Sequence, residues 1–277
     1  MISFGKSDKG RKRNINEDSY YFDSDRGVFI VADGMGGHLA GEEASKIAVD
    51  TISKFLINAS SNIESIIEKS ITTTNNLIHS KSEMDQKFKG MGTTLTCAVF
   101  RNKKLFVGHV GDSRLYQFRD YTLHLLTDDH SKVWEFYKEG IITKDEARTH
   151  PYKNVITRAV GIKPEVHIDI FSVNSLMVGD MYLICSDGLN DMLNDDQITD
   201  ILSLGETGIE QKVDLLIEQA NKNGGKDNIT VILFMMEKID LMREEDSDLL
   251  EHIKTRDYVL FNKSINFTIK TEIITTG

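Results

Sequence analysis

Acidic residues lie beside glycine or asparagine at five places in the sequence, most of them where an apolar run is expected to end. The five segments are Asn16-Glu17-Asp18, Asp33-Gly34-Met35-Gly36-Gly37, Gly111-Asp112-Ser113, Ser186-Asp187-Gly188 and Lys226-Asp227-Asn228. Taken singly, an Asp-Gly pair is a turn signal. Taken together, the segments suit hard divalent cations such as Mn²⁺ and Mg²⁺, which bind carboxylate oxygens and keep several waters. The pattern therefore predicts a divalent-cation site.

Three of these carboxylates are expected to meet at one end of a sheet. Each borders an apolar run with the character of a strand: 28–32 before Asp33, 181–186 before Asp187, and 229–236 after Asp227. If these strands lie side by side, burying the three negative charges together is prohibitive without a cation. A bound metal would remove that repulsion.

The remaining patterns predict the elements that must position these residues. Apolar residues recur every three or four positions in stretches that predict amphipathic helices at 39–56, 63–78 (capped by Asn62), 196–204 and 209–221. Apolar runs predict strands at 94–100, 105–110, 114–118, 121–126, 166–173, 181–185 and 229–236, the first four as one β-meander. Helix pairs between groups of antiparallel strands indicate an α+β layered domain and not a parallel βαβ sheet.

A polar segment at about 128–157 interrupts the strands and is a candidate mobile flap. It contains a helical stretch at 133–139, a Gly140 stop, and a capping box from Thr143 to Glu146. A flap of this kind can close over a bound substrate.

The composition is that of an ordinary soluble globular protein and excludes several functions. The 277 residues carry 33 Lys and Arg against 43 Asp and Glu, a formal net charge of −10. An acidic chain repels nucleic acid phosphates, so we expect no nucleic-acid partner. Neither a signal peptide nor a membrane span of about 18 apolar residues is recognisable, so we expect a cytoplasmic protein without membrane contact. Cys97 and Cys185 lie in apolar runs and are expected to be reduced and buried.

Six short motifs follow one another along the chain: Arg13-Asn14-Ile15-Asn16-Glu17-Asp18, Val31-Ala32-Asp33-Gly34-Met35-Gly36-Gly37-His38, Gly90-Met91-Gly92-Thr93-Thr94, Val110-Gly111-Asp112-Ser113-Arg114, Cys185-Ser186-Asp187-Gly188-Leu189 and Lys226-Asp227-Asn228-Ile229-Thr230. In this order they resemble the signature of the metal-dependent protein phosphatase family (PPM, or PP2C-type) in its bacterial form. The resemblance covers about residues 5 to 236. It implies a four-layer α-β-β-α sandwich, in which a central antiparallel β-sandwich is flanked by helix pairs. This fold agrees with the layered α+β domain expected from the periodicity.

The resemblance also implies a role for each matching residue. Two Mn²⁺ or Mg²⁺ ions would be held as follows: Asp33 bridges them, Asp187 and Asp227 complete one, the Gly34 carbonyl binds the other, and Glu17 and Asp18 hold coordinated waters. Asp112 resembles the ligand of a third, weaker ion in bacterial members. Arg13 would bind the substrate phosphate, because a guanidinium offers paired donors that match phosphate oxygens.

The implied reaction is hydrolysis by a hydroxide that bridges the two ions, with no covalent enzyme intermediate. The metals and Arg13 would offset the negative charge that develops on the phosphoryl oxygens. The group that protonates the departing oxygen stays open. In animal members a histidine directly follows the Asp-Gly pair, but Met35 stands there in this sequence. His38 and His150 are the two candidates for general acid, although a structural or surface role is more common for such histidines.

We expect the protein to act on phosphoserine and phosphothreonine in proteins as a cytoplasmic monomer, opposing a cognate Ser/Thr kinase. One alternative is a catalytically silent PP2C-fold binding or signalling module, whose signature would be a lost metal carboxylate or a lost phosphate arginine; none is lost here. Another is a phosphatase of anti-sigma-factor antagonists, but those relatives typically lack the Arg13 motif and carry sensor domains. We expect a phosphatase domain at 1–238, with the flap at about 128–157, and a C-terminal extension of unknown role at 239–277.

Overall fold

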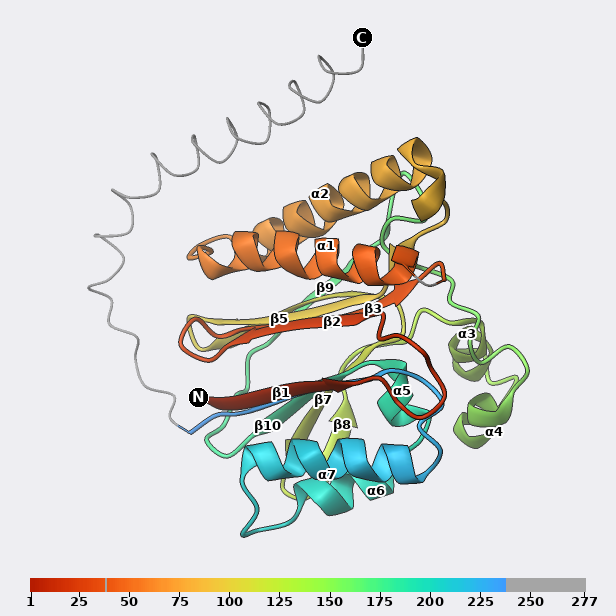
Figure 1. Ribbon diagram of the computed structural model, residues 1–277. Coiled ribbons are helices and arrows are strands. Elements are labelled where there is room, and N and C mark those ends of the chain that lie inside the picture. Colours follow the sequence, from red (N-terminus) through yellow and green to blue (C-terminus); the bar gives the residue numbers. More distant parts are fainter. Residues whose placement is uncertain (38, 238–277) are drawn as a thin grey trace. The chain divides into compact units, whose positions relative to one another are not determined.

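The computed structural model describes residues 1–37 and 39–237. His38 and residues 238–277, which include the predicted extension at 239–277, lie outside the described residues. In the described part, two antiparallel sheets lie face to face and helices cover their outer sides (Figure 1). The order of layers is therefore helix, sheet, sheet, helix, which confirms the predicted α+β sandwich.

The first sheet has the strand order β2-β3-β5-β6-β9, with the short β4 paired to β3. Its strands are β2 (Asp18–Asp23), β3 (Val28–Met35), β4 (Gly92–Thr93), β5 (Leu95–Arg101), β6 (Lys104–Val110) and β9 (Asp169–Val173). The apolar run 28–32 of β3 is fully buried. One of its faces meets helices and the other meets the second sheet, which is why the run is continuous and does not alternate.

The second sheet has the strand order β1-β11-β10-β7-β8. Its strands are β1 (Ile2–Asp8), β7 (Arg114–Arg119), β8 (Thr122–Leu125), β10 (Met181–Cys185) and β11 (Ile229–Met235). Phe29 of the first sheet stacks on Phe234 of the second, with ring centroids 3.9 Å apart, and Tyr182 stacks on Phe234 at 5.2 Å. Burying aromatic rings of this size contributes about 2 kcal/mol each, so the stacking of Phe29 on Phe234 helps to join the sheets, whereas Tyr182 and Phe234 pair within the second sheet.

Two pairs of helices cover the sandwich. Helices α1 (Leu39–Ile57) and α2 (Ile63–Met84) cover the first sheet, and α6 (Asp195–Leu202) and α7 (Ile209–Lys222) cover the second (Figure 1). The shorter helices are α3 (Lys132–Lys138), α4 (Lys144–Thr149), α5 (Asp187–Asn190) and the 3₁₀-helix η1 (Gln86–Phe88). The stripe formed by Ile67, Ile71 and Ile78 of α2 is fully buried, as the periodicity predicts. Asn62 does precede α2, but it has a φ of +50° and its side chain makes no capping bond, so that prediction is wrong.

The predicted β-meander at 94–126 is wrong in its connectivity. Strands β5 and β6 pair within the first sheet, whereas β7 and β8 pair within the second. The chain crosses between the sheets at Gly111, which has a φ of +111° and lies so close to Thr94 that a Cβ would meet its Cβ at 2.6 Å. Strands β1 and β2 were not predicted, because polar residues interrupt the apolar ones in both.

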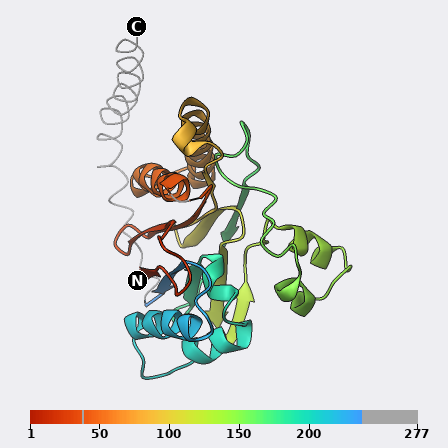
Figure 2. The ribbon, with the colours of Figure 1, turned by 45° about the vertical axis from the view of Figure 1, so that its right-hand side comes forward.

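The segment at 128–157 stands out from the sandwich and carries α3 and α4 (Figure 2). The capping box of α4 is confirmed: Thr143 and Glu146 each accept the other's backbone N–H with their side chains. Gly140, with a φ of +71°, follows α3 as predicted. The segment, called the flap below, is thus distinct from the sandwich, and its role as a mobile flap stays a prediction.

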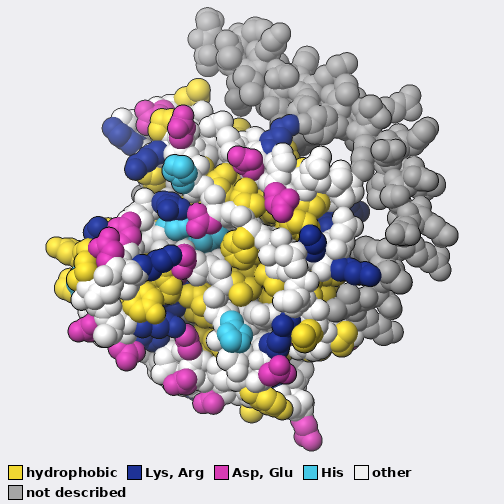
Figure 3. All heavy atoms as spheres, turned by 180° about the vertical axis from the view of Figure 1, so that it is seen from behind, with side chains coloured by type: hydrophobic (Ala, Val, Ile, Leu, Met, Phe, Trp, Pro, Cys, Tyr) yellow, Lys and Arg dark blue, Asp and Glu magenta, His cyan; other side chains and the backbone are white. Residues whose placement is uncertain are grey.

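The helices, the surface and the cysteines also bear on the expectations from the composition. None of the helices in residues 1–37 and 39–237 is both long and apolar enough to cross a membrane. On the face shown in Figure 3, basic and acidic side chains are interspersed and form no large patch of one sign. Cys97 and Cys185 are free and buried, as predicted.

Candidate active site

Acidic side chains from both sheets meet at one end of the sandwich. Asp18 of β2 lies opposite Asp33 of β3 in the strand register. Asp18 also reaches the second sheet, where its Oδ2 accepts hydrogen bonds from Ser186 Oγ at 2.8 Å and Thr230 Oγ1 at 2.6 Å. Ser186 directly precedes Asp187, so the two sheets are held together where their acids lie.

The pKa values of the central acids show that they influence one another. The pKa of Asp33 is well above its ordinary value, first because of burial and then because of the negative charges of Asp18, Asp187, Asp112 and Asp227. Burial and the charges of Asp112 and Asp227 likewise raise the pKa of Asp187. The structure therefore brings Asp33, Asp187 and Asp227 together, as the sequence predicts. Their roles as metal ligands stay predictions.

Asp112 belongs to the same group of acids, and Asp191 joins it. Burial raises the pKa of Asp112 to about 7, and the charges of Asp129 and Asp191 act in the same direction. The charge of Asp191 also raises the pKa of Asp187. Asp191 was not predicted as a site residue, although its spacing of four residues from Asp187 across α5 is the signal of a shared helix face.

Gly34 lies where strand β3 and helix α1 come closest. Its N–H donates to the carbonyl of Glu17 at 3.1 Å, which fixes Glu17 beside the strand. A Cβ on Gly34 would meet the carbonyl oxygen of Gly41 at 2.1 Å and that of Glu17 at 2.6 Å. Only glycine fits this backbone contact. The position of Glu17 and Asp18 beside Asp33 therefore depends on Gly34.

The loop before β2 carries Arg13 to the edge of the acidic group. The Arg13 guanidinium donates to Asp227 Oδ2 at 2.5 Å, and about half of the side chain is exposed. Asn228 holds the loop: its Nδ2 donates to the carbonyls of Lys9 and Ile15 at 3.0 and 2.9 Å, and its Oδ1 accepts the N–H of Glu17 at 2.8 Å. Asn228 stands in the last of the six motifs, but its type and position in the sequence predict no role for it.

Of the two candidate general acids, the structure describes only His150. His38 lies outside the described residues. His150 is half-buried in the flap, where its ring packs against Phe136 and Tyr152 and its Nδ1 accepts the N–H of Tyr152 at 3.1 Å. These contacts give His150 a structural role within the flap, and its assignment as general acid stays a prediction.

The donor set fits an oxygen-binding divalent cation. One buried carboxylate oxygen on each of Asp18, Asp112 and Asp187 has no hydrogen-bond partner among the described residues. Leaving such an oxygen buried and unsatisfied is costly, and a cation would satisfy it. Within residues 1–37 and 39–237, no three acidic, histidine or cysteine side chains are close enough to enclose an ion directly. An open set of carboxylates suits Mn²⁺ or Mg²⁺, which complete their coordination with water.

Comparison with known proteins identifies the family. Residues 7–233 match the family described as protein phosphatase 2C. The serine/threonine phosphatase stp of Listeria monocytogenes is 39% identical over 82% of this chain and 93% of its own length. Protein phosphatase PhpP of Streptococcus pneumoniae is 36% identical over 84% of this chain and 97% of its own.

Solved structures agree with these sequence relatives. The serine/threonine phosphatase PstP/Ppp of Mycobacterium tuberculosis superimposes with a TM-score of 0.79 at 35% identity, covering 86% of this chain and 99% of that chain. The catalytic domain of PstP in complex with two manganese ions gives a TM-score of 0.74 at 35% identity, covering 84% and 96%. The resemblance carried by the six motifs is thereby confirmed, and with it the assignment as a phosphoric monoester hydrolase. The chain belongs to the protein phosphatase 2C family.

Proposed function

We propose that this protein is a metal-dependent phosphatase that removes phosphate from phosphoserine and phosphothreonine in proteins. The observation that carries the proposal is the group of mutually repelling carboxylates from both sheets, with Arg13 at its edge. The relatives named above are serine/threonine phosphatases, which supports the same substrate class.

The proposed metal centre uses the residues named from the sequence. Asp33, Asp187, Asp227 and the Gly34 carbonyl would hold two Mn²⁺ or Mg²⁺ ions, with Glu17 and Asp18 positioning waters. Asp112, with Asp191 beside it, would serve a third ion. Such ions lower the pKa of water, which supplies a hydroxide nucleophile at neutral pH, and they attract the phosphoryl oxygens. The protein holds the carboxylates in place through the hydrogen bonds from Ser186 and Thr230 to Asp18.

Arg13 is the proposed phosphate ligand. Its half-exposed guanidinium is anchored on Asp227 at one nitrogen, so its remaining donors can meet a substrate phosphate beside the acids. The contact to Asp227 also fixes the side chain before substrate arrives, which reduces the entropy lost on binding. Arg13 thus orients the phosphoryl group and stabilises its charge.

Replacing Arg13 by alanine is expected to lower kcat/KM for a phosphothreonine peptide on the order of 100-fold, because a charge-assisted phosphate contact is lost. Steady-state kinetics with Mn²⁺ measure this loss. The control is Arg11→Ala in the same loop, since Arg11 is exposed and donates to the Gly225 carbonyl through its backbone N–H. Equal kinetics for the two variants would contradict the assigned role.

The test of the function is hydrolysis itself. Purified protein is expected to release phosphate from a phosphothreonine peptide and from para-nitrophenyl phosphate when Mn²⁺ is present, and EDTA should abolish both activities. Robust turnover in EDTA would overturn the metal-dependent reaction. Failure to turn over any substrate with Mn²⁺ or Mg²⁺ would instead favour the silent binding module of the same fold.

The finer biological assignments remain proposals. A Ser/Thr kinase of the same cell would supply the phosphoproteins, because a protein phosphatase requires a kinase to make its substrate. The cytoplasmic location, the monomeric state and the boundary at residue 238 also stay predictions from the sequence.

A further inference from the structure

A pocket adjoins the acidic group on the side of the flap. Its lining includes three acids of the sandwich and three cations of the flap: Asp112, Asp187 and Asp191, and Lys144, Arg148 and Lys153. The acids come from the β6–β7 connection and from α5, whereas the cations come from α4 and the turn that follows it. The pocket is therefore polarised, with negative charge at the proposed metal centre and positive charge on the flap wall.

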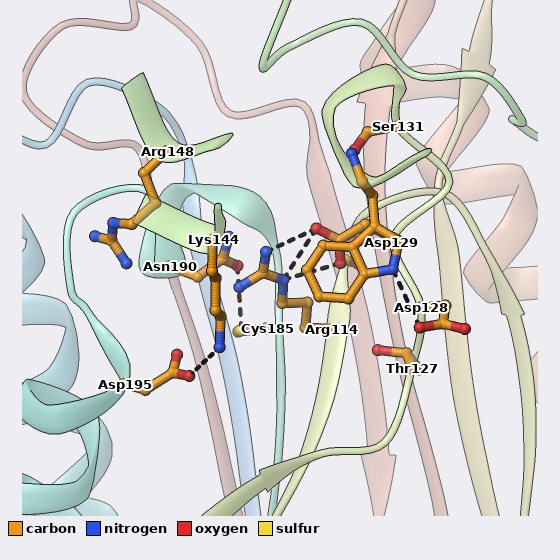
Figure 4. Close-up of polar contacts among 12 residues, drawn as sticks. Arg114, Thr127, Asp128, Asp129, Ser131, Lys144, Arg148, Cys185, Asn190 and Asp195 are labelled. Carbon is orange, nitrogen blue, oxygen red and sulfur yellow. Dashed lines mark hydrogen bonds and ion pairs between the residues drawn. The ribbon is translucent and has the colours of Figure 1, made fainter. Parts of the chain in front are cut away.

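The ion pair of Arg114 and Asp129 also lines the pocket. Arg114 donates to Asp129 through Nε at 2.9 Å and through a terminal nitrogen at 2.7 Å (Figure 4). Its other terminal nitrogen donates to the Tyr116 hydroxyl at 2.9 Å. The guanidinium lies 5.5 Å from the centre of the Trp134 ring. Because Arg114 and Asp129 are mostly buried and satisfy each other, we expect them to form the wall and not to bind a ligand.

Of the three flap cations, Lys153 pairs with Asp191 of the opposite wall. Lys144 and Arg148 are paired less firmly. Lys144 Nζ lies 2.5 Å from Asp195 Oδ2, but the two side chains are 44% and 34% exposed. An ion pair this exposed contributes about 0–1 kcal/mol, so a ligand anion can replace Asp195. Arg148 donates only to the Leu193 carbonyl, at 3.4 Å, and has no carboxylate partner in the described part of the chain. Figure 4 shows Lys144 reaching Asp195, while Arg148 extends from the next turn of α4.

Lys144 and Arg148 are four residues apart on α4 and share a face of that helix. A guanidinium and an ammonium side by side attract a carboxylate or a phosphate, and the guanidinium can bind either one in a bidentate way. We propose that Lys144 and Arg148 form a subsite for a second anionic side chain of the phosphoprotein substrate, close to the phosphorylated residue. The proposal rests on the phosphatase activity proposed above. The anion is either an Asp or Glu carboxylate or a second phosphate.

The test compares phosphopeptides that share a central phosphothreonine. One peptide has neutral flanks, two carry glutamates on either the N-terminal or the C-terminal side, and two carry a second phosphothreonine on either side. The wild type is expected to prefer at least one anionic peptide over the neutral one by about five- to tenfold in kcat/KM, through KM. The glutamate and phosphothreonine arms identify which anion the subsite takes.

Variants then assign the preference to the flap. Arg148→Gln should reduce the preference to about one, Lys144→Gln should reduce it partly, and Arg148→Lys should retain most of it. Lys46→Gln removes the same charge from an exposed position on α1 and should change nothing. Hydrolysis of para-nitrophenyl phosphate should be equal in all of these proteins, which shows that they are folded and active.

Two results would overturn the subsite while leaving the phosphatase intact: no preference in the wild type, or an undiminished preference in both Arg148→Gln and Lys144→Gln. Absence of hydrolysis of every substrate by the wild type would overturn the proposed function, and the subsite with it. The two failures are therefore distinguishable.

Discussion

Asp33→Asn is expected to lower kcat by at least on the order of 1,000-fold and yet to raise the melting temperature of the metal-free protein. Asparagine keeps the shape of the side chain but removes the negative charge that a bridging metal ligand needs. In EDTA that charge lowers the free energy of unfolding, because burial and four neighbouring acids disfavour the ionised form of Asp33 and raise its pKa. Removing a repulsion worth about 1 kcal/mol should raise the melting temperature by about 2–4 °C in a protein of this size.

Asp180→Asn provides a matched control with the opposite sign. Burial alone would raise the pKa of Asp180, but hydrogen bonds from Arg119 and from the Met177 backbone hold it below its ordinary value. Asp180 is almost fully buried and precedes β10, whereas Asp187 follows it, so the two lie toward opposite ends of that strand. Asp180→Asn should therefore keep its activity and lose stability. Phosphatase assays and thermal melts in EDTA measure both quantities, and a stability loss as large in Asp33→Asn as in Asp180→Asn would contradict the expected repulsion.

The metal-free protein is expected to lose stability as the pH rises from 5 to 8. Burial is the main cause that raises the pKa of Asp18 to about 6 and that of Asp112 to about 7. In the unfolded chain both groups titrate near 4, so the folded state binds more protons between these values. Stability from these groups is complete below about pH 4 and is lost as the pH rises through 6 to 7.

Thermal melts in EDTA at pH 5, 6, 7 and 8 measure this loss, to which Asp18 and Asp112 contribute about 4 kcal/mol in total. His109, whose pKa burial lowers to about 3, acts in the opposite direction and regains about 2 kcal/mol as the pH rises through 6.5. Burial lowers the pKa of His130 too, which acts in the same direction as His109. Acids whose pKa is lowered, such as Asp8 and Asp169, act in the opposite direction, but only below about pH 4. Their contribution is constant across the window tested. With saturating Mn²⁺ the decline should disappear, because a bound cation favours the ionised carboxylates. A change of melting temperature between pH 5 and 8 that is the same in EDTA as in saturating Mn²⁺ would refute the assigned repulsion, because the histidines contribute equally under both conditions.

Much of the fold could be predicted from the sequence because its strongest signals are local. The amphipathic stripe of α2 and the capping box at Thr143 depend on residues within a few positions of one another, and both predictions are confirmed. The partner of a strand depends on residues far away in the chain. The pattern at 114–118 is typical of a strand but does not show which sheet it joins, and the crossing at Gly111 sends β7 to the second one.

Some residues of the candidate site could likewise be predicted from local sequence signals, and others could not. Asp33, Asp187 and Asp227 were predictable because each borders an apolar run, and strand ends gather at one edge of a sandwich. Asn228 was not, because its three hydrogen bonds to the loop around Lys9 and Ile15 exist only after the chain has folded. Ser186 and Thr230, whose hydroxyls donate to Asp18, were not predictable either, because neutral polar residues of this kind have no distinctive spacing in the sequence.

The acids described above are shared between the two halves of the sandwich: Asp18 and Asp33 belong to one sheet, while Asp187 and Asp227 border strands of the other. The negative charges of the two sheets repel each other where the sheets meet. The hydrogen bonds from the Ser186 and Thr230 hydroxyls to Asp18 oppose this repulsion. A cation bound by carboxylates of both sheets would replace this repulsion with an attraction that joins the sheets. The cohesion of the two sheets and the proposed phosphatase activity thus depend on the same cation site. Removing the ions would therefore also weaken the attachment of one sheet to the other.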